Sequence, residues 1–316
     1  MDTRNAIHLL LAASFVLLLS SCAKTSVPPK GPLEPISNLR AFSADSTSVG
    51  LAWTPSPSAS TPDFGDYLVN ATPEDQIGGV ILTKSAGSNS SLRFGGLMPS
   101  SVYTFAVIAR PNSSSSAGNS TPLSIVWAPA SRFDSVSGQP ILVYESSSTS
   151  GNAALIFHSS VTGGPRTVNL LNPSTPSDTA EVDLFVRTET ITSVSIRSAD
   201  LYLTPGGTMR FPRTTLFSSF SYSAGNLDDA ELRPPDTSSY APTNTVIEID
   251  TTAAVTSTIF YFRSNDAHYG RLLVRRDPTS GTMIWGTSPD RYLVVEISYQ
   301  PVPANIYSRR SQQEGE

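Results

Sequence analysis

Apolar side chains recur at every second position in short runs along the first third of the chain. Alternation of this kind predicts β-strands, because successive side chains of a strand point to opposite faces. Turn residues separate the runs, so the region is expected to form a two-sheet sandwich. The runs are Ile36–Phe42, Val49–Trp53, Tyr67–Ala71, Val80–Leu82, Leu92–Phe94, Val102–Ala109 and Leu123–Trp127.

The same two-residue period continues to the end of the chain, interrupted by a loop-rich stretch at Ala224–Pro242. No run of ten or more residues has helical periodicity. The pattern predicts an all-β protein whose second domain is a larger antiparallel β-sandwich or jelly roll. Its expected strands are Ile141–Val143, Ala154–Phe157, Val168–Leu170, Val182–Val186, Val194–Ile196, Leu201–Leu203, Val246–Ile249, Ile259–Phe262, Leu272–Val274, Met283–Trp285 and Tyr292–Tyr299.

The two domains are expected to meet at Trp127–Arg132, which contains Pro129. Proline cannot donate to a strand ladder, so pairing should stop there and few contacts should cross the joint. This places the first domain at 33–128 and the second at 132–308. The last residues, 309–316, have no apolar side chains and are expected to be disordered.

Composition argues against two classes of function. Among 316 residues only 15% are charged, and the net charge of -5 argues against binding nucleic acid as the main task. A mean hydropathy of -0.09 excludes a protein with many membrane spans.

The pattern at the N-terminus predicts a sorting signal. Arg4 is followed by the apolar run Ile7–Leu19, which is too short for a bilayer core of roughly 30 Å but suits a signal peptide. Leu19, Ser20 and Ser21 precede Cys22, the only cysteine, and resemble the lipobox of bacterial lipoproteins. In that family, residues equivalent to 1–21 are removed and the cysteine thiol is acylated. The alternative is an ordinary secretory signal with a free or buried Cys22.

Residues 22–32 are rich in proline and predict an extended tether. The resemblance implies a membrane lipid as one partner, with two or three acyl chains as a stable anchor. Ala23 follows the cysteine where enterobacterial inner-membrane lipoproteins have Asp. We therefore expect an outer-membrane lipoprotein of the cell envelope, on either its periplasmic or its outer face.

The first domain resembles the fibronectin type III family, an immunoglobulin-like sandwich. Trp53 matches the buried tryptophan of the family's second strand, and Leu97, Pro99 and Tyr103 match its tyrosine corner. The loop at 111–122 has no Arg-Gly-Asp sequence. The resemblance implies a spacer or a binding platform. Tyr67 and Trp127 are either packed in the core or exposed to a ligand.

Near the C-terminus, Tyr261–Leu272 reads as two strands joined by a turn at Asn265 and Asp266. This hairpin resembles one in the C-terminal domains of envelope lipoproteins of Bacteroidota, some of which capture haem. Arg271 stands where that hairpin has Lys.

Candidate chemistry is sparse. The sequence has no nucleophile elbow, P-loop, zinc-protease or dinucleotide motif. Beyond the signal peptide only His158 and His268 remain as histidines. They could serve a catalytic triad or bind a haem iron, but packing or solvated roles are commoner. We expect no cofactor and no enzymatic activity.

Charged clusters supply the remaining candidates. Carboxylates at Asp228, Asp229 and Glu231 could bind Ca²⁺, although the spacing is not that of an EF-hand. The pairs at 181/183 and 248/250 should each share a strand face, which could suit glycoside hydrolysis but is more often a solvated face.

Arg263, Arg271 and Arg275 form a basic group near the hairpin. They could receive an acidic glycan or a protein partner, or balance acidic strands nearby.

The sequence thus predicts a non-enzymatic envelope lipoprotein. A fibronectin-like spacer would present a β domain to an unknown protein or glycan for binding or adhesion. The alternatives are a module for polysaccharide breakdown and a haem-capturing lipoprotein.

Overall fold

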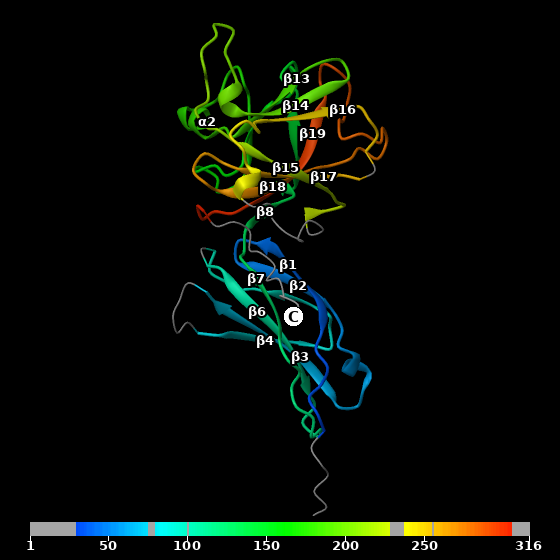
Figure 1. The fold of residues 1–316 in the computed structure, drawn as a ribbon. Helices are drawn as coiled ribbons and strands as arrows, with labels where there is room; N and C mark the ends of the chain where they lie inside the picture. The colour runs from blue at the N-terminus through cyan, green and yellow to red at the C-terminus, as the bar shows by residue number, and fades with distance from the viewer. Residues whose placement is uncertain (1–29, 75–79, 100, 228–236, 255, 305–316) are drawn as a thin grey trace, which may run out of the picture.

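The computed structural model describes residues 30–74, 80–99, 101–227, 237–254 and 256–304 (Figure 1). Two bodies built of strands lie end to end, which confirms the prediction of an all-β protein with two sandwiches. The only α-helix among the described residues is the six-residue α2 (Pro176–Glu181), capped by Thr175. In this part of the chain no helix is long and apolar enough to span a bilayer.

The first sandwich has two antiparallel sheets. Its smaller sheet has the order β1-β2-β5 and its larger sheet the order β4-β3-β6-β7. The strands are β1 (Ser37–Asp45), β2 (Ser48–Thr54), β3 (Phe64–Pro73), β4 (Leu82–Gly87), β5 (Ser91–Phe94), β6 (Tyr103–Pro111) and β7 (Leu123–Trp127). All seven runs therefore contribute strands, but β4 begins only at Leu82 and leaves Val80 and Ile81 exposed.

Alternate side chains of these strands fill one core between the sheets. Trp53 packs edge-on against Tyr67, with ring centroids 5.5 Å apart. Tyr67 and Trp127 are completely buried, so they are core residues rather than ligand contacts. The Tyr67 hydroxyl accepts a hydrogen bond from Ser56 N at 3.0 Å, and Trp127 Nε1 donates to Ser43 Oγ at 3.0 Å. Both polar atoms of the buried rings are thereby satisfied.

The turn before β6 is held by a side chain of that strand. Met98 N donates to the Tyr103 hydroxyl at 2.9 Å, while Leu97 lies in the core. This is the bond that the resemblance to a tyrosine corner implies.

The second sandwich is larger. Its seven-stranded sheet has the order β15-β17-β18-β19-β10-β9, with β8 also paired to β19, and its five-stranded sheet the order β12-β11-β13-β14-β16. The strands are β8 (Ser131–Phe133), β9 (Ser135–Val136), β10 (Gln139–Tyr144), β11 (Ala154–Ile156), β12 (Arg166–Val168), β13 (Leu184–Thr188), β14 (Ser193–Ser198), β15 (Leu216–Ser223), β16 (Val246–Asp250), β17 (Thr258–Arg263), β18 (Tyr269–Val274) and β19 (Tyr292–Tyr299).

The main core of this domain lies between its two sheets. Phe157 and Phe262 stack there with ring centroids 3.8 Å apart. A separate cluster around Phe211 packs near α2, and another contains Leu273 and Tyr240.

Several segments of this domain differ from the sequence-based expectation, among them the short strands β8 and β9, which were not predicted. Leu201–Leu203 is not a strand, because the chain turns through the 3₁₀ segment Ala199–Leu201. Met283–Trp285 contributes only an isolated bridge, from Trp285 to Tyr292. Strand β15 was not predicted, because its serine-rich sequence and the irregular register between Phe217 and Ser221 obscure the alternation.

The joint between the domains is tighter than expected. Pairing does stop around Pro129, but Ala128 and Ala130 are completely buried. Gln300 Nε2 in the second domain donates to Pro129 O at 3.1 Å. The Arg271 guanidinium lies 5.3 Å from the Trp127 ring centroid. These contacts cross the joint at a place where the sequence led us to expect few.

Candidate ligand-binding groove at the domain joint

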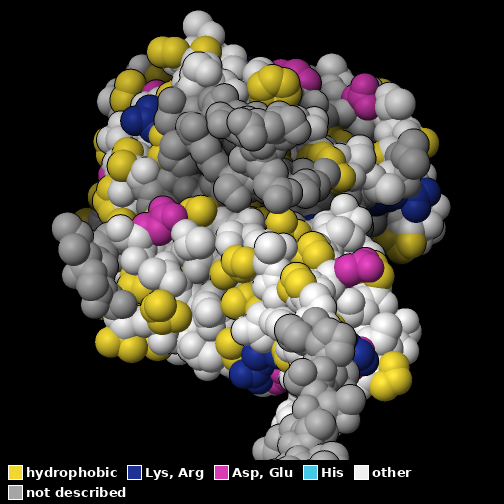
Figure 2. Space-filling model, turned by 60° about the horizontal axis from the view of Figure 1, so that its bottom comes forward, with side chains coloured by type: hydrophobic (Ala, Val, Ile, Leu, Met, Phe, Trp, Pro, Cys, Tyr) yellow, Lys and Arg dark blue, Asp and Glu magenta, His cyan; other side chains and the backbone are white. Residues whose placement is uncertain are grey.

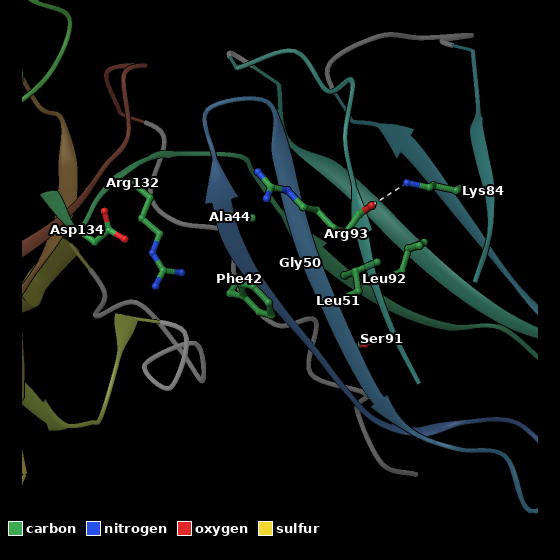
Figure 3. Close-up of a pocket in the computed structure, with 10 residues that line it drawn as sticks. All are labelled: Phe42, Ala44, Gly50, Leu51, Lys84, Ser91, Leu92, Arg93, Arg132 and Asp134. Atoms are coloured by element: carbon green, nitrogen blue, oxygen red, sulfur yellow. Dashed lines mark hydrogen bonds between the residues drawn. The ribbon is translucent and has the colours of Figure 1, made fainter. Parts of the chain in front are cut away.

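A cavity of about 720 Å³ lies where the outer face of the β1-β2-β5 sheet meets the start of the second domain. We call it the joint groove. Figure 3 shows its two walls, one formed by strands of the first domain and the other by β8 and the residue after it. The groove is lined by Phe42, Ala44, Gly50, Leu51, Lys84, Ser91, Leu92, Arg93, Arg132 and Asp134.

The floor of the groove is the ring of Phe42, which packs against the backbone of Gly50. Phe42 and Gly50 are opposite each other on β1 and β2. A Cβ atom on Gly50 would lie 2.2 Å from the Phe42 ring, so only glycine leaves room for the ring against the strand. An aromatic side chain that covers a cross-strand glycine in this way is held flat by the backbone beneath it.

Cations line the first-domain wall. The Lys84 ammonium donates to Arg93 O at 2.9 Å, and the Arg93 guanidinium pairs with Asp45. Burial opposes ionisation of the Asp45 carboxyl, but hydrogen bonds from Thr47 and Arg93 outweigh it and hold its pKa below the ordinary value. Asp45 is therefore charged at neutral pH and keeps Arg93 at the rim.

The second-domain wall adds a further cation and one carboxylate. Arg132 lies on β8, where it is held in register opposite Ser298 of β19. Figure 3 shows its guanidinium reaching toward Phe42, with Asp134 close by on the same wall. The lining thus carries three cations and one carboxylate. With the Asp45 carboxylate that pairs with Arg93, the groove keeps one net positive charge, in a chain whose net charge is -5.

The lining holds few of the titratable groups that acid–base chemistry uses. Its only carboxylate is Asp134, and the lining residues include no histidine or cysteine. Glycoside hydrolysis in particular usually needs two carboxyl groups, one on either side of the bond that is broken. A flat ring with cations around it instead offers apolar contact and charge complementarity.

Several candidates from the sequence fall outside the described residues. These are the lipobox and its cysteine, Leu19, Ser20, Ser21 and Cys22, and the calcium candidates Asp228, Asp229 and Glu231. Within the described part of the chain, no cluster of three or more His, Cys, Asp or Glu side chains is arranged to hold a metal ion.

The three basic candidates near the hairpin do not form an open face. Arg271 is only 2% exposed and lies between the rings of Trp127 and Tyr261. Arg275 Nε donates to Glu296 Oε1 at 2.7 Å, and Arg263 lies over the Tyr269 ring. Arg271 is therefore buried between one ring of each domain and does not contribute to an open basic face.

The two histidines converge on one ring. His158 and His268 both stack on Tyr299, with ring centroids 5.4 Å and 5.2 Å away. His268 Nδ1 donates to Gln300 O at 2.9 Å. Burial and the neighbouring His268 lower the pKa of His158. The cluster therefore ties the two sheets together at one end of the second sandwich.

The acidic pairs also differ from expectation. Glu181 ends α2 and accepts hydrogen bonds from Ser160, whereas Asp183 is buried and pairs with Arg213 at 3.0 Å. Burial raises the pKa of Asp183 to about 6, against the opposing effect of Arg213. These two carboxylates do not share a strand face, which corrects the prediction.

The second pair, Glu248 and Asp250, does lie on β16 with both side chains exposed. Sequence reasoning missed the groove residues Phe42, Arg93 and Arg132. The available signal was Gly50, an isolated glycine inside a strand pattern, which often marks a close approach by another group.

Comparison with known proteins identifies the first domain. Residues 34–134 match the fibronectin type III domain family. The chain therefore carries a fibronectin type III domain, followed by a second β-sandwich. No curated protein matches the chain.

Solved structures similar to this chain include single fibronectin type III domains. The third such domain of the human KIAA0343 protein is 19% identical, with a TM-score of 0.27, and the match covers 34% of this chain and 91% of that one. The FN5 domain of Drosophila Lar is 16% identical, with a TM-score of 0.24, and the match covers 31% and 97%. A fibronectin domain of human collagen XX is 18% identical, with a TM-score of 0.24, and the match covers 32% and 99%.

Proposed function

We propose that this protein is a non-enzymatic, outer-membrane lipoprotein of the cell envelope that binds a ligand in the joint groove. Acylated Cys22 would anchor the chain, and residues 22–32 would form the tether. The fibronectin type III domain would then hold the second domain away from the lipid surface.

The observation that carries the spacer role is where the chain enters and leaves the first domain. Lys30 pairs with Asp63 at 2.8 Å, and Leu33 N donates to Gly118 O at 3.0 Å. In Figure 1 these first described residues lie at the end of the sandwich farthest from the second domain, whereas β8 leaves from the opposite end. An anchor before residue 30 would therefore act on the side away from the groove.

The tight joint supports a binding role for the groove. A ligand site built from two domains keeps its shape only if the domains keep their relative position, because binding to mobile walls costs ordering entropy. Arg271 and Gln300 hold the second domain against Trp127 and Pro129. Ligand sites also occur preferentially at domain interfaces.

The anchor is tested by Cys22→Ser in the native host. We expect the variant to lose acylation, to accumulate as unprocessed precursor and to leave the outer-membrane fraction. Ala23→Ser is the matched control, because it changes the next residue and leaves the thiol in place. A Cys22→Ser protein that is processed and sediments with the outer membrane as before contradicts the lipoprotein assignment.

The binding role is tested on the purified chain with glycan and peptide arrays and with a panel of polysaccharide substrates. Retention without turnover supports a binding protein. Hydrolysis of a polysaccharide would favour the alternative of a module for polysaccharide breakdown. A Soret band on addition of haemin, lost in His158→Ala, would favour haem capture.

A further inference from the structure

We propose that the joint groove binds an acidic saccharide, a chain of sugar rings that carry carboxylates. This inference rests on the proposed function, since it names the class of ligand for the same groove. Phe42 would contact the face of a sugar ring, and the cations around it would bind the carboxylates.

The aromatic floor fits a flat ligand. One face of the Phe42 ring lies against the backbone at Gly50, and the ring lines the groove. A pyranose ring presents a face of C–H groups, which packs on an aromatic ring by apolar contact. Because the ring is supported from below by the strand, it loses little freedom when a ligand covers it.

The cations around the floor select for negative charge. The Arg93 side chain is 64% exposed, and its guanidinium offers paired N–H donors that match a carboxylate. The Lys84 ammonium bonds to the backbone oxygen of Arg93, and Arg132 faces the Arg93 guanidinium from the second domain. A positive groove on an acidic protein also attracts an anionic ligand over the distance of the Debye length.

Asp45 gives this arrangement a specific consequence. The Asp45 carboxylate forms an ion pair with the Arg93 guanidinium, so a ligand carboxylate has to compete with Asp45 for that guanidinium. Removing the charge of Asp45 should therefore strengthen the binding of an acidic ligand. If the Asp45–Arg93 pair had only a structural role, its loss would lower stability and would not tighten binding.

The dimensions of the groove suit a short chain of sugars. About 720 Å³ lies within the range of roughly 300–1,000 Å³ that is typical of small-ligand sites. In the space-filling view a furrow runs between the two domains, and hydrophobic side chains on that face are scattered in small groups (Figure 2). Among the described residues visible on that face, the apolar side chains do not gather into one large patch.

The test is calorimetric titration of the full chain carrying Cys22→Ser with tetragalacturonate and with its uncharged methyl ester. We expect the acid to bind about tenfold or more tightly than the ester, and its affinity to fall with salt. Arg93→Gln should weaken binding of the acid about tenfold, as loss of a charged hydrogen bond implies. Asp45→Asn should tighten it several-fold.

The platform is tested by Phe42→Leu, which keeps apolar cover over Gly50 but removes the flat ring. We expect about tenfold weaker binding of the tetramer, with the melting temperature measured alongside to show that the sandwich is intact. Phe220→Ala and Arg187→Gln are matched controls, because both side chains are exposed on the second domain, and neither should change the affinity.

Equal binding of acid and ester, or an unchanged affinity in both Arg93→Gln and Phe42→Leu, overturns the inference. A polyglutamate peptide that binds as tightly and ignores Phe42→Leu would make the ligand an acidic peptide, and the inference would fail while the binding function stands. If neither the arrays nor these titrations detect any ligand, the binding function of the groove fails as well.

Discussion

At the scale of single residues, one buried ion pair stabilises the second sandwich. Glu145 and Arg291 form a buried pair, with side chains 0% and 4% exposed. Arg291 Nε donates to Glu145 Oε1 at 2.9 Å, and other guanidinium protons reach Ile191 O and Thr190 O. The pair therefore fixes the loop before β14 as well as neutralising itself.

Removing one partner should be costly. Arg291→Met leaves a buried carboxylate and orphaned carbonyls, so we expect the free energy of unfolding to fall by about 3–5 kcal/mol in urea titrations. Arg187→Gln, which breaks a long and half-exposed pair with Glu189, should cost under about 1 kcal/mol. Similar losses in the two variants would mean that burial does not set the energy of the Glu145 pair.

A second prediction at this scale concerns pH. His158 has a lowered pKa in the folded protein because of burial and the nearby His268, while Glu181 opposes the shift and Arg213 adds to it. Near the ordinary pKa of 6.5, His158 therefore binds more protons in the unfolded chain than in the folded one. It contributes stability above pH 6.5, and this contribution is lost as the pH falls through the pKa of the folded state.

His158→Phe keeps a ring on Tyr299 but cannot take up the proton. We expect its unfolding free energy to fall less between pH 7.5 and pH 5 than that of the parent. Urea titrations at the two pH values measure this, and parallel losses in parent and variant would contradict the assignment of His158.

At the scale of the elements, the sequence predicted the hairpin of β17 and β18, but it did not predict the conformation of the turn between them. Ser264 N donates to His268 O at 2.8 Å, which leaves a three-residue loop with Ala267 at φ 62°. Such loops place a residue in the left-handed region, where glycine is preferred. Alanine is strained there, since a Cβ atom costs roughly 1–2 kcal/mol.

Ala267→Gly should therefore stabilise the second domain, by up to about 1 kcal/mol once the entropy of glycine is subtracted. Ala59→Gly, in the 3₁₀ segment η2 (Pro57–Ser60), is the control and should be neutral or destabilising. A differential scanning calorimeter resolves the difference, and a lower melting temperature for Ala267→Gly would refute the strain argument.

The extent to which elements could be predicted follows from their burial. Strands with one buried face, such as β3 and β6, show clean alternation and were expected from the sequence. Strand β15 was missed, because most of its side chains are exposed and serine-rich. The groove was not predictable either, because Phe42 and Arg132 become neighbours of one cavity only through the packing of two domains.

At the scale of the whole molecule, the central claim is that the two β domains form one rigid body with the groove between them. Arg271, buried against Trp127, and Gln300, bonded to Pro129 O, are the contacts that carry this claim. The sequence placed Arg271 in the predicted hairpin, but not its burial against Trp127 of the first domain.

The most direct measurement is the distance distribution between two spin labels, one on each domain, by pulsed electron paramagnetic resonance. Labels at Thr83 and Thr279, both exposed, can be attached to introduced cysteines because Cys22→Ser removes the only native one. The account predicts a single narrow distribution that broadens in Arg271→Ala. A broad distribution in the parent, unchanged by Arg271→Ala, would contradict it.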